Sequence, residues 1–374
     1  MKRVFCFLLI LISVFSFAVT INAAELSLSA QAYELYCPDN GEILLSSNAS
    51  ERLPMASTTK IMTALLALEY AENDNKVVEF TDDMTAEGSS MYLKLGEKVT
   101  LDDLAVGMMM QSGNDAANAA AIAISGNIES FSGLMNQKAE ELGMRDTHFV
   151  TPSGLDDDDH YSTAHDMALL MAYALQNRRF AEITSQSSMT VSFIEPEDKK
   201  VTYPNHNKLL RMYDGCIGGK TGYTDKSGRC LVSAARRDGL TLIAVTLDDR
   251  DDWDDHISMY DCGFGKYSSV ELKADHPGSI GIVGGAVDTV GLFAEPSAPV
   301  VTDKADINRI ESKLFLPAFV YAPVKKGDIA GKVIYVLDGR KIGESSLRCS
   351  EDIDYNDRKR SFTEYIKDLL KWHS

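Results

Sequence analysis

The segment Leu53-Pro54-Met55-Ala56-Ser57-Thr58-Thr59-Lys60, with the apolar run that continues to Tyr70, holds the strongest structural signal in this chain. From Ser57 to Tyr70 apolar residues recur at helical spacing with no glycine or proline between them. This pattern predicts a largely buried helix. A serine at its start and a lysine one turn later would lie on one face, within hydrogen-bonding reach. The helix N-terminus would also favour negative charge that develops on the serine oxygen.

Lys60 has no carboxylate within one turn on this helix face. A lysine that loses water there without gaining a partner has a lowered pKa and can act as a base. The alternative is a lysine that extends to water from the first turn of the helix. A single S-x-x-K arises easily by chance, so the tetrad needs support from other motifs.

Further helices are expected after this one. Thr100 and Asp103 resemble a capping box that opens an apolar helix through Met110. The alanine-rich residues 116–124 predict another helix, and we expect the helical middle of the chain to continue to about Gln176.

Strands are expected on both sides of the helical part. Residues 31–43 predict two strands around an Asn-Gly turn, because these residues tolerate the positive φ of a tight hairpin. Residues 218–224, 229–236 and 240–247 are short runs separated by turn sequences, which predicts an antiparallel meander. Together they favour one sheet covered by helices.

Two polar motifs interrupt these elements. Ser112-Gly113-Asn114 falls in the break between two apolar helices, where Asn114 is either a helix cap or a site residue. Lys220-Thr221-Gly222 lies on the first strand of the meander, and its neighbours Gly218 and Gly219 leave bare backbone that a ligand can approach. The lysine and the threonine hydroxyl would suit a carboxylate. The alternative is an edge strand protected by lysine and glycine.

Composition excludes several classes of protein. A chain of 374 residues with 25% charged and 45% hydrophobic residues is expected to form about two globular domains. Its net charge of −18 predicts repulsion from phosphate backbones, so we expect no nucleic-acid partner. The six cysteines lack zinc-site spacing, and at most a pair such as Cys216 with Cys230 would bridge. The acidic run 156–159 lacks the pattern of a calcium loop.

Both ends of the chain carry targeting signals. Residues 1–24 have the layout of a secretory signal peptide, with an uncleaved membrane anchor as the alternative. Glycine-rich alternating runs predict a small all-β domain at 269–349. Residues 350–374 include an amphipathic helix with basic flanks, which we expect on the outer face of a membrane unless it packs on the protein itself. The protein is therefore expected to be exported.

The motifs S-x-x-K, S-x-N and K-T-G, in this order, resemble the penicillin-binding protein and serine β-lactamase superfamily. The sequence around these motifs is similar to that of the low-molecular-weight penicillin-binding proteins, which are serine-type D-Ala-D-Ala carboxypeptidases of peptidase family S11. The similar segments are 53–60, 107–118, 160–166, 218–224 and 322–347. The resemblance implies an α/β (α+β) transpeptidase-like fold, an antiparallel sheet covered by helices, with residues 25–268 as the catalytic domain. It implies neither cofactor nor metal.

The resemblance also implies roles for individual residues. Ser57 would attack the bond between two D-alanines of a peptidoglycan stem peptide, with Lys60 as the base, and β-lactam antibiotics would acylate the same serine. Ser112 and Lys220 would relay protons. The substrate-binding residues would be Asn114 for the substrate amide, Lys220 and Thr221 for the terminal carboxylate, Gly222 for close approach, and Tyr223, whose backbone N–H would join that of Ser57 in an oxyanion hole.

Several alternatives stay open at this point. A β-lactamase, an endopeptidase of the same fold and an inactive wall-binding scaffold would share these motifs. Arg250, in an aspartate-rich segment, is a candidate for binding the substrate carboxylate. His160 either contacts the site or braces the loop that contains it, and we favour the second interpretation.

Overall fold

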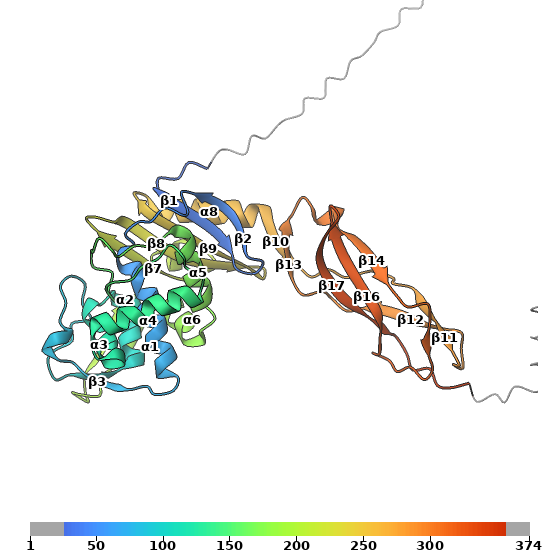
Figure 1. Cartoon of the computed structure of the whole chain (residues 1–374), viewed down its shortest axis with the longest axis horizontal. Helices are drawn as coiled ribbons and strands as arrows, with labels where there is room; N and C mark the ends of the chain where they lie inside the picture. Colours follow the sequence, from blue (N-terminus) through green and yellow to red (C-terminus); the bar gives the residue numbers. More distant parts are fainter. Residues whose placement is uncertain (1–25, 357–374) are drawn as a thin grey trace, which may run out of the picture.

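The computed structural model describes residues 26–356, which form a helix-rich part around one sheet and an elongated all-β part (Figure 1). The predicted signal peptide and the amphipathic residues of the predicted terminal helix lie outside the described residues. Residues 350–356, at the start of that predicted helix, are not helical and contain isolated bridges at Ile353 and Tyr355.

The central sheet has five antiparallel strands in the order β2-β1-β9-β8-β7. Its strands are β1 (Ala32–Cys37), β2 (Glu42–Ser47), β7 (Cys216–Thr224), β8 (Gly228–Arg237) and β9 (Leu240–Asp249). The predicted hairpin and the predicted meander are both present, and the pairing of β1 with β9 joins them into one sheet. This arrangement leaves β7, the strand that carries Lys220-Thr221-Gly222, at an edge.

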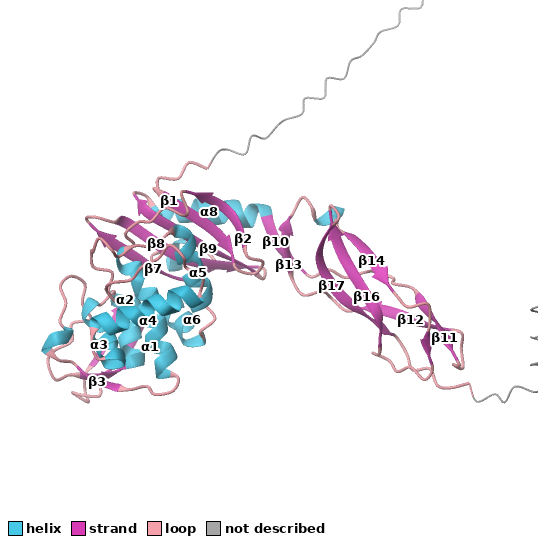
Figure 2. Cartoon of the chain, in the orientation of Figure 1, coloured by secondary structure: helices cyan, strands magenta, loops and turns pink. Residues whose placement is uncertain are grey.

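Helices cover both faces of this sheet (Figure 2). Helix α8 (Asp252–Lys266) packs on one face, and α5 (Ala164–Ala174) packs against β1 and β9 on the other. Most of the other helices form a bundle on the α5 side: α1 (Lys60–Ala71), α2 (Leu101–Gln111), α3 (Asn114–Ser125), α4 (Ile128–Glu141) and α6 (Arg178–Ser185). The predicted capping box is confirmed at α2, and the buried alanines of α3 let its neighbours approach closely.

The expectation of continuous helix to about Gln176 is wrong for residues 142–163, which form a loop. Gly143, Gly154 and a run of aspartates disfavour helix there, and the loop's backbone groups bond to side chains instead. Shorter elements that the sequence did not signal complete this part: β3 (Val77–Glu79) with β4 (Lys98–Thr100), β5 (Ser188–Ser192) with β6 (Lys200–Pro204), η1 (Ala56–Thr59), η2 (Asp82–Met84) and α7 (Leu209–Met212).

The C-terminal part is all-β apart from one 3₁₀ turn, η3 (Ile307–Arg309). A two-stranded unit of β10 (Tyr267–Val270) and β13 (Val300–Asp303) adjoins α8. The main sheet has the order β14-β16-β17-β12-β11-β15. Its strands are β11 (Ser279–Val283), β12 (Thr289–Ala294), β14 (Glu311–Phe315), β15 (Val320–Tyr321), β16 (Ile329–Leu337) and β17 (Arg340–Cys349).

The cysteines of the described part are free thiols. Cys216 lies opposite Ala235 and Cys230 lies opposite Gly222 in the β7–β8 ladder, so the two are too far apart along the strands to bridge. Within residues 26–356, none of the helices has the length and apolar character needed to cross a membrane.

Candidate active site

Ser57 and Lys60 lie where the turn η1 continues into α1. Ser57 belongs to the turn and Lys60 is the first residue of the helix. The Nζ atom of Lys60 lies 2.9 Å from Oγ of Ser57 and 2.6 Å from the carbonyl oxygen of Ser153. Lys60 is fully buried, whereas Ser57 is partly exposed. The pair thus presents a hydroxyl to a pocket and keeps the amine away from water.

Burial shifts the protonation of two lysines. It lowers the pKa of Lys60 well below the ordinary value of 10.5, and the nearby charge of Lys220 lowers it further, while Asp115 opposes the shift. Burial lowers the pKa of Lys220 to about 7. Lys60 is therefore neutral far more often than an exposed lysine at neutral pH, and a neutral amine can accept a proton.

The edge strand β7 passes close to Ser57 because Gly222 has no side chain. A Cβ at Gly222 would lie 2.9 Å from the carbonyl oxygen of Met55 and 3.1 Å from the backbone nitrogen of Ser57. Alternate backbone N–H groups of an edge strand have no partner strand. Lys220 is buried, and its Nζ donates to the carbonyl oxygen of Thr221 at 2.6 Å. The strand therefore brings a buried amine and bare backbone to the serine.

Ser112 and Asn114 lie at the break between α2 and α3, as predicted. Ser112 adopts a left-handed conformation with φ of 59°, lines the same pocket as Ser57, and its hydroxyl has no hydrogen-bond partner within residues 26–356. Asn114 is the first residue of α3 rather than its cap. Its side-chain nitrogen donates to the carbonyl oxygen of Glu87 at 2.6 Å, and its buried Oδ1 is without a partner in the described chain. Asn114 does not line the pocket that Ser112 lines.

The loop 142–163 reaches the site through Ser153 and Gly154. Gly154 has φ of 81°, and a Cβ there would overlap the carbonyl oxygen of Ala56. Nδ1 of His160 accepts the backbone N–H of Val150 at 2.9 Å, so its Nε2 carries the proton and donates to Thr59 at 2.8 Å. Burial lowers the pKa of His160 to about 4, which keeps the ring neutral. His160 therefore braces the loop against the turn that holds Ser57.

Asp115 anchors the segment around Ser90 and Met91, on the opposite side of the pocket. Its carboxylate accepts the backbone N–H of Met91 at 2.7 Å and the hydroxyl of Ser90 at 2.7 Å. Ser89, next to these residues, lines the pocket beside Ser112. Neither this anchor nor the Ser153 carbonyl is visible in the sequence, because each depends on contacts between distant segments. The aspartate directly after the S-x-N motif is the only local signal.

The pocket that results has a volume of about 320 Å³. It brings together Ser57, Ser112, Thr221, Gly222 and Tyr223. Its outer wall consists of His206, Lys208, Arg229, Asp252 and Trp253. Arg250, the candidate for carboxylate binding, does not line this pocket and faces a neighbouring hollow instead.

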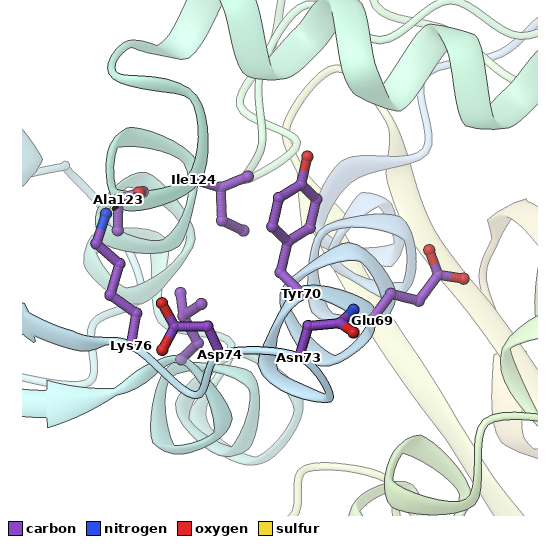
Figure 3. A pocket seen from close by; sticks show the side chains of 8 residues that line it. Glu69, Tyr70, Asn73, Asp74, Lys76, Ala123 and Ile124 are labelled. Atoms are coloured by element: carbon purple, nitrogen blue, oxygen red, sulfur yellow. Dashed lines mark hydrogen bonds between the residues drawn. The ribbon is translucent and has the colours of Figure 1, made fainter.

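A separate hollow of about 470 Å³ lies at the far end of α1 (Figure 3). Tyr70 and Ile124 form its apolar wall, and Lys76 donates to the carbonyl oxygen of Ala123 at 2.8 Å. No residue of the three sequence motifs lines it. The chemistry-bearing side chains therefore gather in the smaller pocket at β7.

The pocket at β7 has the parts that acyl transfer needs. A serine hydroxyl lies beside a desolvated amine, a second buried lysine lies on the adjacent strand, and an edge strand offers backbone N–H groups. Within residues 26–356, acidic, histidine and cysteine side chains form no cluster that could hold a metal ion. Fold and pocket together are those of a serine acyl-transfer enzyme.

The chain belongs to the D-alanyl-D-alanine carboxypeptidase family, whose sequence profile matches residues 19–251. A second profile, that of the penicillin-binding protein 5 C-terminal domain, matches residues 267–355. These matches confirm the resemblance drawn from the three motifs, and with it the mixed α+β fold and the all-β C-terminal part.

Curated relatives and solved structures agree with the profiles. The chain is 31% identical to D-alanyl-D-alanine carboxypeptidase DacF of Bacillus subtilis, over 98% of this chain and 97% of that protein. It is 33% identical to DacC of Escherichia coli, with 91% and 89% covered. Penicillin-binding protein 5 of Haemophilus influenzae superposes with a TM-score of 0.65 at 28% identity, covering 88% of this chain and 98% of that one.

Proposed function

We propose that this enzyme is a serine-type D-Ala-D-Ala carboxypeptidase that removes the terminal D-alanine of peptidoglycan stem pentapeptides through an acyl-enzyme on Ser57. The observation that carries the proposal is the 2.9 Å contact between Oγ of Ser57 and Nζ of the fully buried Lys60. Family membership supports the substrate class, because the relatives are named as D-alanyl-D-alanine carboxypeptidases.

In the first half-reaction Oγ of Ser57 attacks the carbonyl carbon of the penultimate D-alanine. The hydroxyl proton passes to neutral Lys60, and the carbonyl oxygen becomes an oxyanion that the backbone N–H groups of Ser57 and Tyr223 stabilise. The C–N bond then breaks, the proton taken up by Lys60 passes through Ser112 and Lys220 to the leaving nitrogen, and D-alanine departs with Lys60 neutral again. Water, which gives a proton to Lys60, attacks the resulting ester; the ester C–O bond breaks, the serine oxygen takes this proton back, and the shortened peptide leaves as a carboxylic acid.

The remaining residues of the proposed site hold the substrate. Thr221 and Lys220 face the terminal carboxylate, and Gly222 lets the peptide backbone approach the strand. Asn114 holds the amide of the preceding residue, which requires its side chain to exchange the Glu87 carbonyl for substrate. β-Lactams acylate the same serine, as expected of a penicillin-binding protein. We do not favour a β-lactamase or an inactive scaffold, since the three motifs are intact and the relatives are carboxypeptidases.

We further propose that the enzyme is exported and works on the cell wall. The predicted signal peptide at 1–24 supports export. The amphipathic residues near the C-terminus support attachment to the outer face of the cytoplasmic membrane. The proposed division is a catalytic domain at 25–268, a small all-β domain at 269–349 and a terminal helix within 350–374. The boundary near 268 is supported by the strand β10, which begins the all-β part at Tyr267.

Release of D-alanine from a defined stem pentapeptide tests the activity. We expect release by the wild-type chain and none above background by Ser57→Ala. Release that persists in Ser57→Ala would contradict the assignment of the nucleophile. Absence of release and of any β-lactam adduct in folded wild-type protein would favour the scaffold alternative. Rapid, repeated turnover of penicillin would favour a β-lactamase.

A further inference from the structure

The outer wall of the pocket contains an arginine that belongs to none of the three motifs. Arg229 lines the same pocket as Ser57 and Thr221, whereas Arg250 does not. Arg229 is the second residue of β8 and follows the turn after β7. Its guanidinium therefore lies where it can contact a ligand in the pocket.

The register of the sheet shows which way Arg229 points. Tyr223 of β7 lies opposite Arg229 of β8, and Thr221 lies opposite Leu231. Residues directly opposite one another project from the same face of a sheet, and so do residues two apart along a strand. The side chains of Thr221 and Arg229 are therefore diagonal neighbours on one face, with their backbones about 7 Å apart. A hydroxyl and a guanidinium at that separation can reach the same small anion.

The guanidinium of Arg229 has an ion-pair partner but keeps N–H groups that a ligand can use. Asp252, at the start of α8, is its ion-pair partner, with 3.9 Å between Nη1 and Oδ1. The aspartate side chain is 5% exposed and the arginine side chain is 55% exposed. Within the described chain, Arg229 donates no side-chain hydrogen bond, so its N–H groups stay available to a ligand. A planar guanidinium with free donors matches the geometry of a carboxylate.

The charged residues in the wall of the pocket also favour an anion. Lys208, on the same wall, lies over the ring of Trp253 with its Nζ 5.7 Å from the ring centre. The outer wall of the pocket thus carries two cations, Arg229 and Lys208, and one carboxylate, that of Asp252. Both cations also line the neighbouring hollow, which adds Arg250, Asp251 and Asp254. On the pocket side the two cations would attract a negatively charged substrate terminus to a protein with net charge −18.

We propose that Arg229 binds the terminal carboxylate of the leaving D-alanine together with Thr221, and that Asp252 is a positioning residue for Arg229. The inference rests on the proposed carboxypeptidase function and assigns one residue of its substrate specificity. In this arrangement the carboxylate lies between β7 and the start of α8, and the scissile bond lies over Ser57. Arg250 takes no part.

Two peptides and two matched variants test this assignment. One peptide ends in D-Ala-D-Ala with a free carboxylate, and the other carries the same sequence as a C-terminal amide. We expect Arg229→Gln to lower kcat/KM for the free acid by about 10- to 100-fold, mainly through KM, and to change kcat/KM for the amide by less than about threefold. Arg250→Gln, the control, should resemble wild type with both peptides. Arg229→Lys should restore part of the loss, and Asp252→Asn should raise KM for the acid alone.

Each other outcome has a definite meaning. Equal losses on both peptides would assign Arg229 a structural role and overturn the inference, as would an unchanged preference for the acid or a loss confined to Arg250→Gln. Penicillin titration to full stoichiometry shows that Ser57 and its surroundings are intact in each variant. Failure of the proposed function is separate, because wild-type protein would then release neither D-alanine from the acid nor D-alaninamide from the amide and would form no penicillin adduct.

Discussion

The carbonyl oxygen of Ser153 accepts a hydrogen bond from Lys60, with 2.6 Å between oxygen and Nζ. A neutral amine has two N–H donors and one lone pair. Because one donor is occupied by this carbonyl, the lone pair can face the hydroxyl of Ser57 at 2.9 Å. The loop 142–163 would therefore help to orient Lys60 as the proton acceptor of the proposed mechanism.

Replacing the amine tests its role as the base. Lys60→Ala should slow β-lactam acylation of Ser57 by roughly 10²- to 10⁴-fold, the usual contribution of a positioned general base. The matched control is Lys76→Ala beyond the far end of α1, which should acylate at the wild-type rate. Stopped-flow acylation with a fluorescent penicillin measures both. An unchanged rate in Lys60→Ala would rule out lysine as the base.

The pH dependence of acylation should reflect the lowered pKa of Lys60. Burial and Lys220 move this pKa well below 10.5, so the neutral form is abundant at pH values where an exposed lysine is almost fully charged. We expect the acylation rate to rise with pH and to level off well before pH 10. A rate that keeps rising tenfold per pH unit up to pH 10 would contradict this prediction.

Gly154 should be intolerant of substitution. Gly154→Ala forces a side chain into a left-handed backbone conformation and against the carbonyl of Ala56, which should lower the free energy of unfolding by about 1–3 kcal/mol. Displacement of the neighbouring Ser153 carbonyl should also reduce D-alanine release. Gly133→Ala is the control: this residue lies in α4 with open space around it, and the change should stabilise by up to about 1 kcal/mol. Denaturant unfolding and D-alanine assays of both variants check the contrast, and equal stability of the two would refute it.

His160 should make the fold sensitive to acid. Its pKa in the folded protein is about 4 and its ordinary value is 6.5, so the unfolded chain binds the proton more readily. The stability contributed by the neutral ring is complete above about pH 6.5 and is lost as pH falls toward 4. Urea unfolding at pH 7 and pH 5 should show a smaller difference for His160→Gln than for wild type. Identical differences in wild type and His160→Gln would count against the assignment.

Sequence patterns predicted the parts of the site that depend on local periodicity. The 57–70 helix, the Thr100–Asp103 cap and the β7–β9 meander follow from residue spacing over one or two turns. The loop 142–163 could not be predicted in the same way, because its conformation depends on contacts with Lys60 and Thr59 far away in the sequence. Arg229 is a similar case: its place in the pocket depends on the register of β8 and on the start of α8.

The most direct test of the central claim is the mass of the protein after incubation with penicillin, followed by peptide mapping of the adduct. We expect one penicilloyl group per wild-type chain, attached to the peptide that contains Ser57, and none on Ser57→Ala. An adduct on another residue, or none on folded wild-type protein, would contradict the account of Ser57 as a nucleophile activated by Lys60.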